Sequence, residues 1–227
     1  MIKTMLSFIL KAILSKAIFG AILFLSAGTL RWTMAWVYIA IYLAFDIATA
    51  ILVTPRHPDL LVERTRIGQN TAGWDKVLVR VVAAYGPFAT WIVSGLQYRF
   101  HWQPVIPIPW QWAAAGLTAI GFGIVAWSMT YNAFFAVTAR LQPERGQTVA
   151  SDGPYRIVRH PGYLGAMLFN TTTALMLGAA WALIPGVITS GLFILRTLLE
   201  DRMLRAELPG YEDFTRKTRY RLIPYIW

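Results

Sequence analysis

The sequence contains no cysteine and few charges. Without cysteine, the 227-residue chain can form neither disulfides nor thiolate zinc or iron–sulfur sites, and it has no cysteine nucleophile. Its three histidines, His57, His101 and His160, form no metal-ligand pattern, so no metal site is predicted. Charged residues make up only 14% of the chain and hydrophobic residues 56%, whereas about a quarter of a soluble domain is charged. This composition excludes both a soluble globular domain and a disordered chain.

Acidic residues are scarce relative to basic ones, with 11 Asp and Glu against 21 Lys and Arg, which gives a formal charge of +10. Such an excess suits either nucleic acid or the negatively charged cytoplasmic leaflet of a membrane. Because the background is strongly apolar and rich in aromatic residues, which gather at membrane interfaces, we expect membrane lipid and not nucleic acid as the partner.

Apolar runs approaching the length of a membrane-spanning helix, about 20 residues, recur along the chain. They predict an all-α, polytopic membrane protein with about six transmembrane segments. These are expected at residues 17–30, 32–53, 77–96, 110–137, 162–183 and 186–199. The first segment has three interpretations: a tilted span, an interfacial helix leading into a span, or a cleaved signal peptide. The pair Pro185-Gly186 separates the last two, which are therefore predicted to form a helical hairpin.

The placement of Lys and Arg predicts the orientation in the membrane. All of these residues except Arg31 and Arg99 fall in the N-terminus, in the second and fourth connectors, or in the C-terminal region. Cytoplasmic segments carry the excess of Lys and Arg, and an even number of crossings returns the chain to its starting side. We therefore expect an integral membrane protein with both termini in the cytoplasm.

Residues 146–165, GQTVASDGPYRIVRHPGYLG, are polar, basic and rich in turn residues between two apolar segments. Pro161 suits the first position of a helix, whose N-terminus offers free N–H groups to an anion. Arg156 and Arg159 add cationic donors nearby. The stretch is therefore either a seat for a carboxylate or phosphate, or a positively charged cytoplasmic loop with aromatic anchors.

Charged residues reappear at the end of the last apolar segment. Arg196 and Glu200 are four residues apart and share one helix face, and Asp201 follows. They either face a polar cavity or form a local ion pair where the helix leaves the membrane. The hairpin would bring Glu200 near His160 in a pocket open to the cytoplasm. The basic, aromatic tail of residues 208–227 is either a segment on anionic lipid or a lid over that pocket.

Several motifs occur in a fixed order: GPYRIVRHPGYLG, an apolar hairpin, and RTLLEDRMLRAELPGYEDFTRKTRYRLIP. Over residues 146–224 they resemble the isoprenylcysteine carboxyl methyltransferase family of integral membrane enzymes. The chain departs from the family pattern at Asp201, where the family has a second Glu, and at Phe214, where it has a second Tyr. The resemblance implies an S-adenosylmethionine-dependent methyltransferase. Residues 141–227 would form its catalytic region with a cytoplasmic lid, and residues 1–140 its N-terminal helices and inner loop.

The resemblance also implies roles for individual residues. Arg196 and Glu200 match the pair nearest the reacting groups, and with Asp201 they are expected to be catalytic. A further set, extending from the loop to the last helix, is expected to bind the cofactor, with Arg159 added as a nearby cationic donor. The set is Val149, Tyr155, Arg159, His160, Pro161, Tyr163, Leu164 and Glu200.

The methyl acceptor is expected to be a lipophilic small molecule or a lipid-anchored substrate. The chemistry that names the family is methylation of the carboxyl group of a prenylated cysteine, which Arg196 could hold by two hydrogen bonds. A phospholipid amine or a small thiol is the alternative, and Glu200 or Asp201 would then act as the base. Two other classes are an NADPH-dependent membrane reductase and a non-enzymatic lipid-binding or transport protein.

Overall fold

The structure is a computed structural model that describes residues 2–60 and 71–227, with side chains of the first helix described from residue 13 onward. Every regular element in these residues is helical, which confirms the predicted all-α class. The longer helices are α1 (Ile2–Ala27), α2 (Thr33–Val53), α5 (Gly86–Phe100), α6 (Ile108–Thr130), α7 (Pro161–Met176) and α8 (Leu183–Glu207). The short elements are α4 (Asp75–Arg80), a π turn η1 (Val81–Tyr85), the 3-10 turns η2 (Pro143–Arg145) and η3 (Gly153–Arg156), and α9 (Tyr211–Lys217).

In the part of the chain that the structure describes, four stretches of helix are long and apolar enough to cross a membrane: α2, α6, α8 and the continuous helix Asp75–Phe100, which comprises α4, η1 and α5. The expected first and fifth segments are not among them. Helix α1 has 26 residues, of which the described apolar part is Ile13–Ala27. Helix α7 has 16 residues, whereas a span needs about 20. The prediction of six full spans is therefore not confirmed, although helices do occupy all six places.

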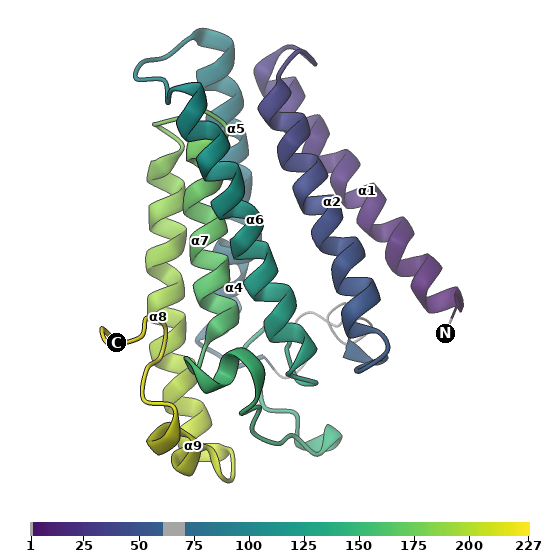
Figure 1. The fold of residues 1–227 in the computed structure, drawn as a ribbon, viewed down its shortest axis with the longest axis vertical. Coiled ribbons are helices and arrows are strands. Elements are labelled where there is room, and N and C mark those ends of the chain that lie inside the picture. The colour runs from purple at the N-terminus through teal and green to yellow at the C-terminus, as the bar shows by residue number, and fades with distance from the viewer. Residues whose placement is uncertain (1, 61–70) are drawn as a thin grey trace.

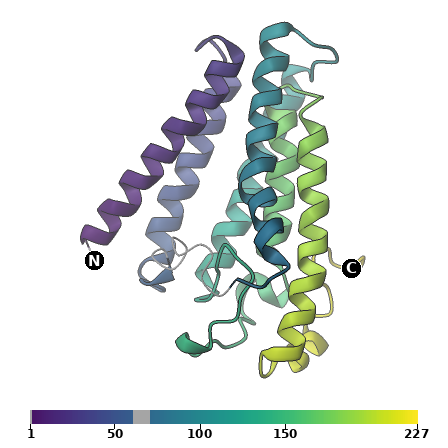
Figure 2. The same cartoon turned by 180° about the vertical axis from the view of Figure 1, so that it is seen from behind.

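The helices form an elongated bundle in which α1 and α2 lie on one side (Figures 1 and 2). Helix α7 packs between α6 and α8, while α1 contacts α5 and α2 contacts α6. Figure 1 shows α1 and α2 diverging from the other helices toward the end of the bundle where the loops gather. The hairpin partners α7 and α8 are joined through Ser190, whose hydroxyl donates to the Met167 carbonyl at 3.2 Å and is hydrogen-bonded to Thr171 Oγ1 at 2.9 Å.

Two predicted boundaries are wrong by several residues. Helix α6 ends at Thr130, so residues 131–137 belong to the following loop. The hairpin turn lies at residues 177–182 and not at Pro185-Gly186, because Gly178 takes up a left-handed conformation (φ 77°) that ends α7. Pro185 instead lies in the first turn of α8, where the missing N–H of a proline does little harm.

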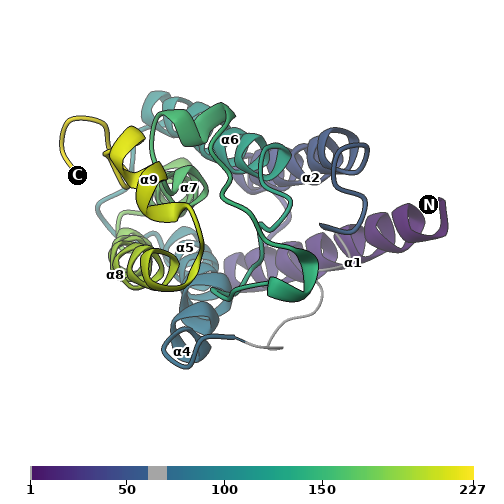
Figure 3. The same ribbon diagram turned by 90° about the horizontal axis from the view of Figure 1, so that it is seen from below.

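Seen from the loop end, the chain segments that follow α6 and α8 cross the base of the bundle (Figure 3). Aromatic rings fill the interior between the two sides: Tyr42 stacks on Phe122 at 4.8 Å, and Phe122 on Phe169 at 4.3 Å, between ring centroids. The loop of residues 131–160 and the tail from α9 onward thus cover the ends of the helices whose apolar faces enclose this interior.

Candidate functional site

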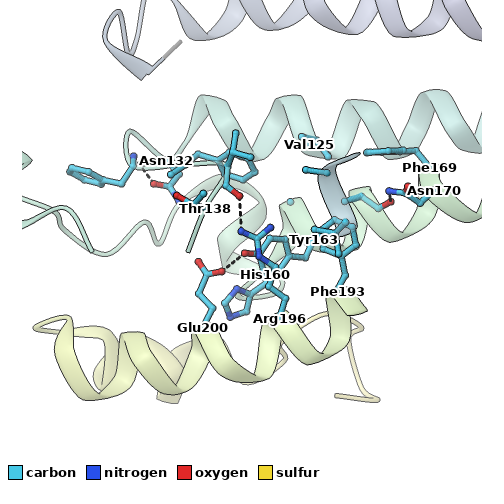
Figure 4. A pocket seen from close by; sticks show the side chains of 18 of the residues that line it. Val125, Asn132, Thr138, His160, Tyr163, Phe169, Asn170, Phe193, Arg196 and Glu200 are labelled. Carbon is cyan, nitrogen blue, oxygen red and sulfur yellow. Dashed lines mark hydrogen bonds between the residues drawn. The ribbon is translucent and has the colours of Figure 1, made fainter. Parts of the chain in front are cut away.

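A cavity of about 350 Å³ runs from the loop end into the bundle. Its outer part is lined by the loop after α6, by α9 and by the end of α8, and its inner part by aromatic and aliphatic residues of α1, α2, α5, α6 and α7. Figure 4 shows His160 and Glu200 toward one end, and Phe169 and Asn170 toward the other. The cavity is lined both by residues of the predicted N-terminal part, 1–140, and by residues of the predicted catalytic region, 141–227.

Tyr163, Arg196 and Glu200 line the cavity where its polar and apolar parts meet. The Tyr163 hydroxyl donates a hydrogen bond to Glu200 Oε2. The Arg196 guanidinium carbon lies 5.2 Å from the centre of the Tyr163 ring, within the range of a cation–π contact. These three residues, from α7 and α8, form what we call the junction of the cavity.

Arg196 is held by a residue that the sequence motifs do not indicate. Its Nε and Nη2 donate to the two carboxylate oxygens of Asp75, each at 2.8 Å, and Nη2 also donates to the Val137 carbonyl at 2.6 Å. Asp75 is fully buried and accepts a further bond from the Ala139 N–H at 2.6 Å. Of the two alternatives for Arg196 and Glu200, both residues line a cavity, and the carboxylate that pairs with Arg196 is Asp75 at the start of α4.

Asp201 faces away from the cavity, into a cluster that binds the tail. Its carboxylate accepts hydrogen bonds from Arg159 (2.8 and 3.2 Å), Arg221 (3.0 Å) and the Tyr211 hydroxyl (3.1 Å). Arg205 lies 3.4 Å away. We call Asp201 with these four residues the tail-anchoring cluster. Asp201 and Arg159 are almost completely buried in it.

Backbone contacts reinforce the attachment of the tail. Nη1 of Arg159 donates to the carbonyls of Thr218 and Arg219. The backbone N–H groups of Arg159 and His160 donate to the carbonyls of Tyr220 and Arg221, both at 2.9 Å. Arg159 borders the cavity, yet these bonds direct its guanidinium toward Asp201 and the tail.

His160 connects the cluster to the cavity, which it lines. Its Nε2 lies 3.4 Å from Asp201 Oδ1 and 3.4 Å from the Tyr211 hydroxyl. Its ring is nearly parallel to that of Tyr163, with centroids 5.7 Å apart. Burial, and next to it the charge of Asp201, raises the pKa of the Tyr211 phenol.

The outer part of the cavity has an apolar wall around Tyr155. The buried residues Tyr155, Leu204, Leu208, Tyr211 and Phe214 form one cluster, and Val149 packs against it. The Tyr155 hydroxyl accepts a hydrogen bond from Asn132 Nδ2 at 3.1 Å, and burial raises its pKa above the ordinary value.

The structure brings most of the predicted site residues to one cavity. Those that line it are Val149, Tyr155, Arg159, His160, Tyr163, Arg196 and Glu200. Pro161 and Leu164 lie in the first turn of α7 without lining the cavity, and Asp201 lies in the tail-anchoring cluster. Asp75, which motif matching missed, carries one signal that could have found it: it is an acidic residue at the edge of an apolar segment.

An all-helical bundle with four helices apolar enough to span a membrane, and with a cavity that joins a polar end to an apolar interior, indicates a membrane protein. The phospholipid methyltransferase family model matches residues 110–208, from the start of α6 to just beyond α8. The matched range includes the junction, the loop after α6, and Arg159, Asp201 and Arg205 of the tail-anchoring cluster. No curated protein matches the chain. The match and the four spanning helices together indicate an integral membrane methyltransferase.

Proposed function

We propose that the chain transfers a methyl group from S-adenosylmethionine to a lipophilic acceptor at the membrane. The observation that carries this proposal is the junction, where Tyr163, Arg196 and Glu200 lie between an outer cavity with polar groups and an inner cavity of aromatic rings. An enzyme that transfers a group from a polar cofactor to a lipid needs a place where the polar and apolar parts of its cavity meet. Methyl transfer then depends chiefly on orientation of the reactants and exclusion of water.

The outer cavity fits the chemical groups of S-adenosylmethionine. When bound, this cofactor supplies an electrophilic methyl group. The apolar wall formed by Val149, Tyr155 and Leu208 would hold the adenine, and the carboxylate of Glu200 and the ring of Tyr163 would face the cationic groups. His160 would complete the polar wall. We assign Arg159 and Asp201 a positioning role. They are hydrogen-bonded to each other, and Arg159 also donates to the backbone of the tail that covers this part of the cavity.

The charges at the junction favour an acceptor that loses a proton. Arg196 is paired with Asp75, so Arg196, Asp75 and Glu200 together carry a formal net charge of −1. A carboxylate acceptor would bring a second negative charge beside Glu200, whereas an amine would find in Glu200 a base for its proton. We therefore propose a phospholipid amine as the acceptor, in agreement with the family similarity.

Carboxyl methylation of a prenylated cysteine is the second candidate. It is favoured by Arg196, which lines the cavity and whose Nη1 group has no hydrogen-bond partner among the described residues. This nitrogen could hold one carboxylate oxygen, although the bidentate edge that the sequence suggested for this purpose faces Asp75. The motif order over residues 146–224 supports this candidate as well.

The proposal is tested by incubating purified protein in detergent with labelled S-adenosylmethionine and three kinds of acceptor: phosphatidylethanolamine in its diacyl and 1-acyl lyso forms, a farnesylated cysteine and a small thiol. We expect base-stable label in the phospholipid. Base-labile label in the farnesylated cysteine would indicate an ester and select the second candidate. Failure to bind S-adenosylmethionine in calorimetry would overturn the proposed function itself.

We also propose that both termini and the tail face the cytoplasm. The loop of residues 131–160 and α9 lie at one end of the bundle (Figure 1), and this end carries Arg140, Arg145, Arg156 and Arg159. Positive charge of this kind is retained on the cytoplasmic side. Residues 141–227 would act as the catalytic region together with α2, α5 and α6, whose residues line the inner cavity.

A further inference from the structure

The inner end of the cavity carries polar groups among its aromatic rings. Tyr38, Thr90, Asn170 and Thr173 line this end together with Phe122 and Phe169. Polar side chains at this depth in a membrane protein are costly and are retained where they have a partner. Their hydrogen bonds therefore indicate which of them is available to a ligand.

Three of these side chains already have partners. The hydroxyl of Thr90 donates to the Gly86 carbonyl at 3.0 Å, and that of Thr173 donates to the Phe169 carbonyl at 2.7 Å. The Tyr38 hydroxyl accepts from Trp91 Nε1 at 3.1 Å. The oxygen atom of each hydroxyl thus takes part in a hydrogen bond within or between helices.

Asn170 differs because only one side of its amide is used. Its Nδ2 donates to the Ala166 carbonyl at 2.8 Å. Since that carbonyl can only accept, the nitrogen must face it, and Oδ1 is left as an acceptor. Oδ1 receives no hydrogen bond from any residue that the structure describes, while the side chain is only 5% exposed and lines the cavity. An unpartnered acceptor on a side chain that lines a cavity is available to a hydrogen-bond donor of a ligand.

The position of Asn170 relates it to the junction. Tyr163 and Asn170 are seven residues apart on α7, so they share one face of the helix and lie about 10 Å apart along its axis. Figure 4 shows Asn170 near Phe169, toward the end of the cavity opposite Glu200. A ligand that extends from the junction into the bundle would pass from Glu200 to Asn170.

We propose that Asn170 Oδ1 is a specificity-determining contact that accepts a hydrogen bond from a hydroxyl or amide N–H on the lipophilic acceptor. This group lies about two helical turns from the atom that is methylated, or about 10 Å. The proposal rests on the proposed function, because the junction defines the methylated end. It adds that the acceptor is not a plain hydrocarbon beyond its reactive group, but carries a hydrogen-bond donor along its length.

The test uses two probes that differ by one hydroxyl: a 1-acyl lysophosphatidylethanolamine and its 2-deoxy analogue, whose amines are separated from that position by the same phosphodiester. Binding of each to the purified full-length protein in nonionic detergent is measured by calorimetry. We expect the wild type to bind the hydroxyl probe about tenfold more tightly, as expected when a buried polar group loses its partner. In Asn170→Leu the ratio of the two affinities should fall to about one.

Two further variants complete the test. Thr90→Val is the matched control, because it removes a hydroxyl of the same inner cavity that is already bonded to the Gly86 carbonyl; its affinity ratio should equal that of the wild type. Asn170→Ala removes Oδ1 without adding bulk and should behave like Asn170→Leu, while gel filtration verifies folding. Equal binding of both probes by the wild type, binding of neither, or an unchanged ratio in both Asn170 variants would overturn the proposal. Binding of S-adenosylmethionine, measured separately, tests the proposed function alone.

Discussion

The end of α8 serves two regions that use their charges differently. In the tail-anchoring cluster, Asp201 is surrounded by three arginines, and its carboxylate is turned away from the cavity. At the junction, the neighbouring residue Glu200 borders the cavity and is bonded to a tyrosine hydroxyl. The cluster has more positive than negative charge and is saturated with contacts, whereas the junction keeps a carboxylate available. Two adjacent acids can therefore have separate tasks, one in folding and one in chemistry.

Substitution of Glu200 should distinguish the junction from the tail-anchoring cluster most clearly. We expect Glu200→Gln to lower methyl transfer by about 10²–10⁴-fold, because the amide cannot take a proton from the acceptor. The thermal unfolding temperature in detergent should stay near that of the wild type. Transfer of labelled methyl groups measures the first effect. Glu207→Gln, at an exposed position of the same helix, is the control, and full activity of Glu200→Gln would contradict the assignment.

The opposite result is expected at Asp201. Asp201→Asn removes the charge that faces Arg159 and Arg221, and breaking such a buried pair typically costs about 3–5 kcal/mol of stability. Chemical unfolding in detergent and limited proteolysis of the tail measure the loss. Asp213→Asn, on the exposed surface of α9, should leave both unchanged. A stable Asp201→Asn variant with an intact tail but no activity would show that Asp201 is catalytic. The distinction between a structural Asp201 and a catalytic Glu200 would then be wrong.

Asp75 determines how the charge of Arg196 is used at the junction, and its substitution should affect the two candidate acceptors differently. Asp75→Asn would free the guanidinium of Arg196 from a charged partner while keeping a side chain of the same shape. We expect turnover of an amine acceptor to fall by roughly 10–100-fold, since small displacements of positioning groups have effects of this size. Turnover of a carboxylate acceptor should fall less, because Arg196 regains a free positive charge. The ratio of the two rates is the readout, with Lys76→Gln, an exposed neighbour, as control.

Sequence reasoning located the site through short-range motifs and failed where contacts are distant. The residues around His160 and the pair Arg196 and Glu200 were predicted to meet because a hairpin returns the chain to its starting side, and they line one cavity. Asp75 was missed because it is 121 residues from Arg196 in the sequence. No periodicity or spacing reports a pairing over that separation.

The fold was predictable to a similar extent. Apolar runs marked all six helical segments, because hydrophobicity over a long window is a strong signal. Their lengths were less predictable: the run of residues 162–183 is interrupted when Gly178 adopts a positive φ, and proline in a first helical turn does not end a helix. Asn170 was also overlooked, since one amide in an apolar segment looks like ordinary helix packing until its unused oxygen is seen to border a cavity.

The smallest expected effect concerns Arg156, three residues before Arg159. Both are arginines of one basic loop, but Arg156 pairs with Asp152 on the surface, where the two side chains are 74% and 64% exposed. Exposed pairs contribute about 1 kcal/mol or less. Arg156→Ala should therefore leave methyl transfer unchanged and lower stability by less than about 1 kcal/mol, whereas Arg159→Ala should loosen the tail. Proteolysis of the tail compares the two variants. If Arg156→Ala abolished S-adenosylmethionine binding, the cofactor would depend on surface charge of the loop, and the division between a saturated cluster and an open junction would be wrong.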